Sequence, residues 1–143
     1  MLSFARMASL IDLSTLRVGR KGAAELVVAE EHTAPRVGSG RIHVLATPVM
    51  INLFEAAALD ALDQHLPAGY QSLGTILSVR HIAATPVGMK VFAEARITRV
   101  DGRTVYFDVA AKDQNELIGD GTHERVVVNV EKFSARVQKK LGK

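Results

Sequence analysis

The chain has 143 residues, of which 48% are hydrophobic, 23% are charged and none is cysteine. This composition predicts one globular domain over residues 1–143 and excludes disulfide and thiol chemistry. A formal charge of only +3, 5% aromatic residues and the lack of tryptophan speak against nucleic-acid binding.

The first residues carry no sign of export or membrane insertion. The opening MLSFARMASLIDL lacks the long apolar segment of a signal peptide. No apolar run in the chain reaches the roughly 18 residues of a membrane span. We therefore expect a cytoplasmic protein with no membrane partner. Residues 1–20 show no clear pattern, and we expect a flexible arm or a short helix there.

The central feature of the chain is a predicted helix within residues 45–65. A first strand is expected before it, at residues 23–30. The intervening HTAPRVGSGRIHV contains proline and glycine, which break regular structure. Thr47 and Pro48 suit a helix start, and Pro67 marks its end. The apolar positions recur at helical spacing and form one wide stripe: Met50, Leu53, Phe54, Ala57, Ala58, Ala61 and Leu62.

Predicted strands dominate the second half of the chain. The four expected strands are residues 73–84, 90–100, 104–112 and 117–130. Asp101 and Gly102 between two alternating runs are a strong hairpin signal. Gly119 and Gly121 suggest a bulge in the last strand. Apolar residues four apart predict a short helix at residues 131–141.

One strand, one long buried helix and four antiparallel strands make an α+β fold. We expect an antiparallel sheet of about five strands wrapped round the helix. Such a sheet leaves one edge and one flank of the domain uncovered. Pairing with a second copy would cover them, so we expect a homodimer, and dimers could pair further into a tetramer.

Glu55 is the residue of the helix that most needs an explanation. It shares a helix face with Ile51 and Leu59, and a carboxylate in apolar surroundings is unfavourable by several kcal/mol unless it is partnered. Two interpretations are open from the residues alone. The carboxylate could pair with an arginine or with backbone amides, or it could be a reactive group.

Three stretches carry a family resemblance across residues 17–140: ATPVMINLFEAA, SLGTILSVRHIAATPVGM and GTHERVVVNVEKF. They resemble the hotdog-fold thioesterases, and most closely the fluoroacetyl-CoA thioesterase type. The spacings of eight and 26 residues match the family's catalytic set, which the resemblance places on Thr47, Glu55 and His81. It places the family's glycine on Gly74, whose amide would bind the oxyanion.

The resemblance implies hydrolysis of an acyl-CoA thioester at the interface of a homodimer, without a cofactor. The family's lid is longer than HTAPRVGSGRIHV and carries a phenylalanine, so we expect a general small or medium acyl group rather than fluoroacetyl selectivity. No residues have convincing zinc spacing, and no metal is expected. Two alternatives stay open: a hotdog hydratase or dehydratase acting on an acyl thioester, and a non-catalytic acyl-CoA-binding module.

The chemistry assigns a role to each residue of the set. Glu55 could activate water or attack the thioester directly, and His81 could orient Glu55 or protonate the leaving thiolate. Thr47 could simply cap the helix. A regular helix would separate Thr47 from Glu55 by roughly 12 Å along its axis. Either the helix therefore starts later, near Met50, or Thr47 contacts another part of the substrate.

Arg125 is a further candidate, as a possible contact to CoA. It shares a strand face with His123, because alternate residues of a strand point the same way. Its guanidinium could meet a CoA phosphate or form a structural ion pair, and we favour the structural pair. Gly74 likewise has a second interpretation, as a turn residue.

Overall fold

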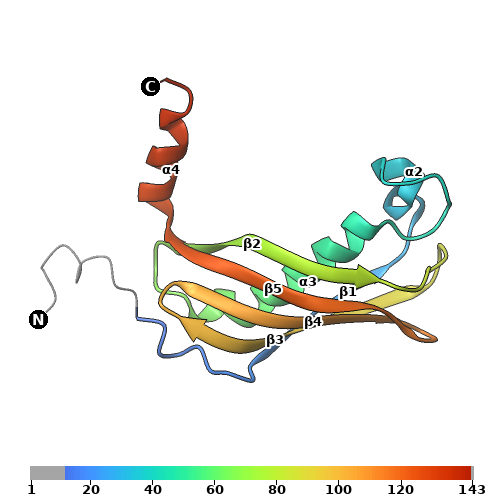
Figure 1. Cartoon of the computed structure of the whole chain (residues 1–143), viewed down its shortest axis with the longest axis horizontal. Helices are drawn as coiled ribbons and strands as arrows, with labels where there is room; N and C mark the ends of the chain where they lie inside the picture. The colour runs from blue at the N-terminus through green and yellow to red at the C-terminus, as the bar shows by residue number, and fades with distance from the viewer. Residues whose placement is uncertain (1–11, 143) are drawn as a thin grey trace, which may run out of the picture.

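A computed structural model of the chain describes residues 12–142 (Figure 1). Five antiparallel strands form one curved sheet with the order β1-β3-β4-β5-β2. The strands are β1 (Lys21–Val27), β2 (Tyr70–His81), β3 (Lys90–Asp101), β4 (Thr104–Asp113) and β5 (Leu117–Asn129). The helices are α2 (Ala34–Val37), α3 (Thr47–Leu62) and α4 (Val130–Lys139), with single 3-10 turns at Glu30–His32 and Asp63–His65. The sheet wraps round α3, which confirms the predicted α+β architecture.

α3 forms where the apolar periodicity predicts it, and all seven residues of the predicted stripe are buried. The helix starts regularly at Thr47, with Pro48 in its first turn. The N-terminal cap of the helix differs from the prediction. The N-cap residue is Ala46, and no side chain caps the helix, because alanine has no polar side-chain atom and Thr47 is already the first helical residue.

Small residues allow β1 to lie directly on α3. A Cβ added at Gly22 would stand 2.1 Å from the carbonyl oxygen of Ala57 and 2.5 Å from the amide nitrogen of Ala61. Both are backbone atoms of the helix, so only glycine fits at this position of the strand. This contact joins the sheet to the helix along one side of the core.

The strands follow the predicted order, and Asp101–Gly102 forms the β3–β4 hairpin, with Gly102 at φ +60°. Their ends differ from the prediction. β1 ends at Val27 because the chain then turns, and the amide of Ala29 donates to Nδ1 of His32. The second strand runs from Tyr70 to His81, which is about three residues earlier at each end than expected.

The expected bulge in β5 lies beside the two glycines and not on them. The register with β4 shifts between Ala111 and Lys112, opposite Ile118, whereas Gly119 and Gly121 pair regularly. Both glycines serve close packing instead: a Cβ at Gly121 would meet the carbonyl oxygen of Ser78 at 2.1 Å. A second shift, between β2 and β5, falls at Thr75.

The remaining segments precede, connect or follow the strands and α3. Residues 1–11 of the expected arm lie outside the described part of the chain, and in residues 12–20 the side chains of Leu13 and Leu16 are buried in the core. The segment before α3 was expected to be irregular but contains the short helix α2, which ends at Gly38 with φ +84°. α4 confirms the predicted terminal helix and extends away from the sheet (Figure 1). Within residues 12–142, no helix combines the length and apolarity that crossing a membrane requires.

Candidate functional site

α3 and β2 run in opposite directions and bring the predicted residues together in two pairs. Thr47 at the start of α3 lies beside His81 at the end of β2. Eight residues further along α3, Glu55 lies beside Gly74 in the first half of β2. The reversal arises because the chain turns back after α3 through Asp63–His65. One helix and one strand thus position all four residues.

The first pair is joined by a hydrogen bond. Oγ1 of Thr47 lies 2.7 Å from Nδ1 of His81. The other ring nitrogen of His81, Nε2, is buried and has no hydrogen-bond partner among the described residues. Burial lowers the pKa of His81 below its ordinary 6.5, and the backbone of Ala83 opposes this effect. His81 is therefore neutral at pH 7, and one of its two ring nitrogens carries no proton.

A cleft of about 350 Å³ opens over this pair. Thr47 and His81 line it together with residues 39–42, 44 and 45 of the connecting segment and residues 82–84 after β2. Its lining includes the apolar side chains of Ile42 and Ile82, which are 74% and 52% exposed. Cavities of this size bind small organic ligands.

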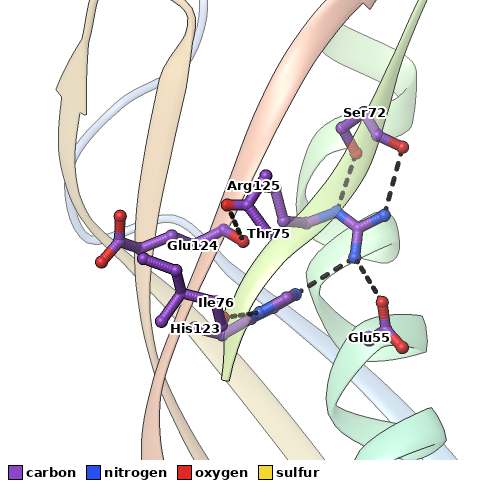
Figure 2. Close-up of polar contacts among 7 residues, drawn as sticks. All are labelled: Glu55, Ser72, Thr75, Ile76, His123, Glu124 and Arg125. Atoms are coloured by element: carbon purple, nitrogen blue, oxygen red, sulfur yellow. Dashed lines mark hydrogen bonds and ion pairs between the residues drawn. The ribbon is translucent and has the colours of Figure 1, made fainter. Parts of the chain in front are cut away.

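Glu55 of the second pair contacts a network of buried polar groups (Figure 2). Nη1 of Arg125 donates to Oε2 of Glu55 at 3.2 Å, and the arginine side chain is only 5% exposed, against 35% for Glu55. Nε and Nη2 of Arg125 donate to the hydroxyl and the carbonyl oxygen of Ser72 at 2.8 and 3.2 Å. Nη1 also lies 3.1 Å from Nε2 of His123. The guanidinium thus compensates the charge of Glu55 through Oε2 and leaves Oε1 for other partners.

Gly74 allows the backbone of β2 to approach this network. A Cβ at this position would stand 2.6 Å from Oε2 of Glu55, 3.1 Å from Cε1 of His123 and 3.4 Å from Nη1 of Arg125. The first distance is closer than real Cβ contacts. The backbone of Gly74 therefore lies next to the carboxylate, and a side chain here would displace it.

The two pairs are distinct places within one chain. α3 is regular from Thr47, so the alternative of a later helix start is wrong, and roughly 12 Å of helix separates Thr47 from Glu55. His81 bonds to Thr47 and not to Glu55. Two roles were expected for Arg125, a contact to CoA and a structural ion pair. The structure shows the ion pair, because the buried guanidinium is directed at Glu55, Ser72 and His123.

His123 and Ser72 belong to the site but were not among the predicted site residues. The signal in the sequence is two polar residues at alternate positions, His123 and Arg125, followed on the same strand face by Val127. On an inward face, polar residues in this pattern require partners. The identity of those partners depends on how β2 pairs with β5, which the pattern does not give.

The described part of the chain contains no group of three or more His, Cys, Asp or Glu side chains able to hold a metal ion.

Comparisons with known proteins find relatives of this chain. A profile of the family described as fluoroacetyl-CoA-specific thioesterase (FlK) matches residues 28–131. The fluoroacetyl-CoA thioesterase of Streptantibioticus cattleyicolor is 44% identical over 97 residues, which is 68% of this chain and 70% of that protein. A solved structure of the fluoroacetyl-CoA thioesterase FlK superimposes with a TM-score of 0.83 at 38% identity, covering 87% of this chain and 96% of that one. Another FlK structure holds acetyl-CoA in a variant enzyme.

More distant structures share the fold. A hypothetical protein of Thermus thermophilus, described as a thioesterase superfamily member, has a TM-score of 0.83 at 29% identity, with 89% of this chain and 94% of that chain covered. A hot-dog-like protein of Thermanaerovibrio acidaminovorans has a TM-score of 0.84 at 25% identity, with coverages of 93% and 99%. The curved sheet round α3 is therefore a hotdog fold.

Proposed function

We propose a mechanism from one premise: this chain belongs to the fluoroacetyl-CoA-specific thioesterase family and has its hotdog fold. The protein is accordingly an acyl-CoA thioesterase that hydrolyses a small acyl thioester. The observation that carries our assignment of residues is the pairing of Thr47 with His81 and of Glu55 with Gly74 along one helix and one strand.

Hydrolysis forms a bond from oxygen to the carbonyl carbon and breaks the carbon–sulfur bond. We assign the first step to Oε1 of Glu55, because Oε2 accepts from Arg125. Oε1 either takes a proton from the attacking water or itself attacks the carbonyl and forms an anhydride that water then cleaves. The amide of Gly74 stabilises the negative charge that develops on the carbonyl oxygen. The carbonyl double bond forms again as the thiolate leaves.

His81 and Thr47 act on the substrate at the second position, beside the start of α3. Neutral His81 accepts a proton released in the reaction and delivers it to the departing thiolate. The hydroxyl of Thr47 holds the ring through Nδ1 at 2.7 Å. A single thioester carbonyl cannot contact both pairs of one chain, because roughly 12 Å of helix lies between them.

We therefore propose that the reaction centre is completed across a homodimer. β2 is an edge strand of the sheet, with Leu73 and Ile76 39% and 50% exposed on it. Antiparallel pairing of two β2 edges around a two-fold axis would place the end carrying His81 beside the half that carries Gly74 in the partner. Thr47 and His81 of one protomer then face Glu55 of the partner subunit.

The acyl group of the substrate is small in this proposal. The segment between β1 and α3 lines the cleft beside Thr47 and contains no phenylalanine. Its contribution to the cleft comes from aliphatic residues such as Ile42 and Val44. We propose acetyl-CoA and other short acyl-CoA thioesters as substrates and assign no selectivity for fluoroacetyl-CoA. We further propose that the enzyme acts in the cytoplasm.

Glu55→Gln and His81→Ala test the residues and the dimer together. Each variant alone should lose at least about 100-fold in kcat, the lower scale for removing a positioned base, measured as free thiol released from acetyl-CoA. The matched control is Glu131→Gln, an exposed carboxylate in α4, which should keep full activity. Turnover by Glu55→Gln equal to that of the wild type would exclude the assigned role.

Mixing the two inactive variants separates a shared site from a site within one chain. After subunit exchange, random pairing makes about half of the dimers mixed, and each mixed dimer has one intact site of two, so about a quarter of wild-type activity should return. If each site used residues of one chain only, no intact site would form in the mixture and no activity would return.

A further inference from the structure

His123 is a buried titratable residue that the proposed mechanism does not use. It lies on β5 with no exposed surface, and its ring stacks on Phe107 with the ring centroids 5.9 Å apart. Its Cε1 would be 3.1 Å from a Cβ at Gly74. The imidazole therefore lies close to the backbone of β2 at Gly74, which also approaches Glu55.

The partners of His123 select a single form of the ring. Nδ1 lies 2.8 Å from the carbonyl oxygen of Ile76, which can only accept a hydrogen bond. Nε2 lies 3.1 Å from Nη1 of Arg125, which can only donate. Nδ1 therefore carries the proton and Nε2 offers a lone pair. A protonated ring would direct a second N–H at the guanidinium and break the contact.

The charges around the ring agree with this form. Burial lowers the pKa of His123, and the charge of Arg125 on the same strand lowers it further. The carbonyl of Ile76, Glu55 on α3 and Glu124 on β5 act in the opposite direction without reversing the shift. His123 is thus neutral at pH 7.

Arg125 needs this acceptor to hold its orientation. Nη1 carries two hydrogens, of which one is directed at Glu55 and the other at His123. Ser72 fixes the opposite edge of the guanidinium through Nε and Nη2. Without the lone pair of His123, one buried N–H of Arg125 would lose its partner, and Nη1 could turn away from Glu55.

We propose that His123 is a positioning residue of the thioesterase: as the Nδ1–H tautomer it accepts a hydrogen bond from Arg125 and so aims the guanidinium that holds Oε2 of Glu55. The inference rests on the proposed role of Glu55. It explains why a polar ring occupies a fully buried position in β5, and it assigns the reactive oxygen of Glu55 to Oε1.

Two amide substitutions of His123 test its two hydrogen bonds separately. In His123→Asn the amide nitrogen can still donate to Ile76, but the acceptor for Arg125 is lost. In His123→Gln the amide oxygen can take the place of Nε2 and accept from Arg125. We expect kcat to fall by about 10- to 100-fold in the Asn variant, the scale for a misplaced catalytic group, with KM nearly unchanged. The Gln variant should recover most of this loss.

A double variant shows whether His123 acts through Glu55. In a Glu55→Gln background, His123→Asn should have almost no further effect on kcat, because coupled residues are not additive. Ile97→Ala is the control for lost stability, since Ile97 is a buried residue of β3 outside the network. It should lower Tm while leaving kcat unchanged. Equal losses of kcat in the Asn and Gln variants, or additive losses in the double variant, would overturn the proposal.

The tautomer is measurable in the unaltered protein. Nitrogen-15 NMR of the histidine side chains should show His123 with a protonated Nδ1 and an unprotonated Nε2 at pH 7. An Nε2–H tautomer or an imidazolium would overturn the proposal even if the variants fail to fold. An active Glu55→Gln enzyme would instead refute the proposed function, whereas an inactive Glu55→Gln beside a fully active His123→Asn would refute only the positioning role.

Discussion

Gly74→Ala introduces one methyl group at the closest approach of β2 to the carboxylate. The added Cβ would stand 2.6 Å from Oε2 of Glu55, and ordinary contact begins at 3.4 Å. Oε2 must therefore retreat by about 0.8 Å, and a misplacement of about 1 Å can reduce a rate by roughly 100-fold. That loss corresponds to about 2.7 kcal/mol of transition-state stabilisation. We expect it in kcat, because Glu55 does not set the fit of the acyl-CoA.

The same substitution should leave stability nearly unchanged. Gly74 does not have a positive φ, so alanine is compatible with the backbone and gains about 0.4–1 kcal/mol from the unfolded state. The closest clash falls on the end of the Glu55 side chain and can be relieved by its rotation. The Cβ would also stand 3.1 Å from Cε1 of His123, which requires that ring to shift by a few tenths of an ångström. Thiol release from acetyl-CoA gives kcat and KM, and thermal unfolding gives Tm. Ser78→Ala, an exposed position on the same strand, is the control. A kcat within about twofold of wild type would refute the argument that the backbone of Gly74 positions the carboxylate.

Two further predictions concern pH and packing. Because burial lowers the pKa of His81 below 6.5, the folded protein binds fewer protons than the unfolded chain below that pH. Stability should therefore be full above pH 6.5 and fall as the pH drops from there toward the folded pKa. By contrast, kcat/KM should fall only as the pH drops through the folded pKa, because it reports the protonation of His81 in the folded enzyme. His81→Asn should weaken the dependence of Tm on pH, and an unchanged dependence would contradict this origin. Gly22→Ala should destabilise the fold by about 3 kcal/mol or more, because the added Cβ would meet backbone atoms of Ala57 and Ala61. An unchanged urea midpoint would contradict the close contact of β1 with α3.

Local patterns were sufficient to predict α3, α4 and the five strands, but not the short helix α2. The periodicity of α3 and the Asp101–Gly102 turn depend on residues close in sequence, and both appear as expected. Element ends were less well predicted, because β2 begins where its pairing with β5 begins. Tyr70 pairs with Asn129, and a residue so distant in sequence leaves no trace in the local pattern.

The predicted site was incomplete for the same reason. Thr47, Glu55, His81 and Gly74 were named from a family spacing, and the structure adds which of them are neighbours within one chain. His123 was recognised as sharing a strand face with Arg125, but nothing in that pattern indicated that both are buried beneath Gly74.

Local sequence patterns were enough for the α+β architecture, for the long apolar helix, and for placing Glu55 on that helix and His81 on a strand, because periodicity and turn chemistry act over a few residues. The partners of Glu55 and His81 follow from the tertiary fold. Glu55 meets Arg125 across 70 residues, and Thr47 meets His81 across 34. Such contacts depend on the register between β2 and β5 and on the reversal of the chain after α3, and one residue of slip would turn the same side chains to the opposite face of the sheet.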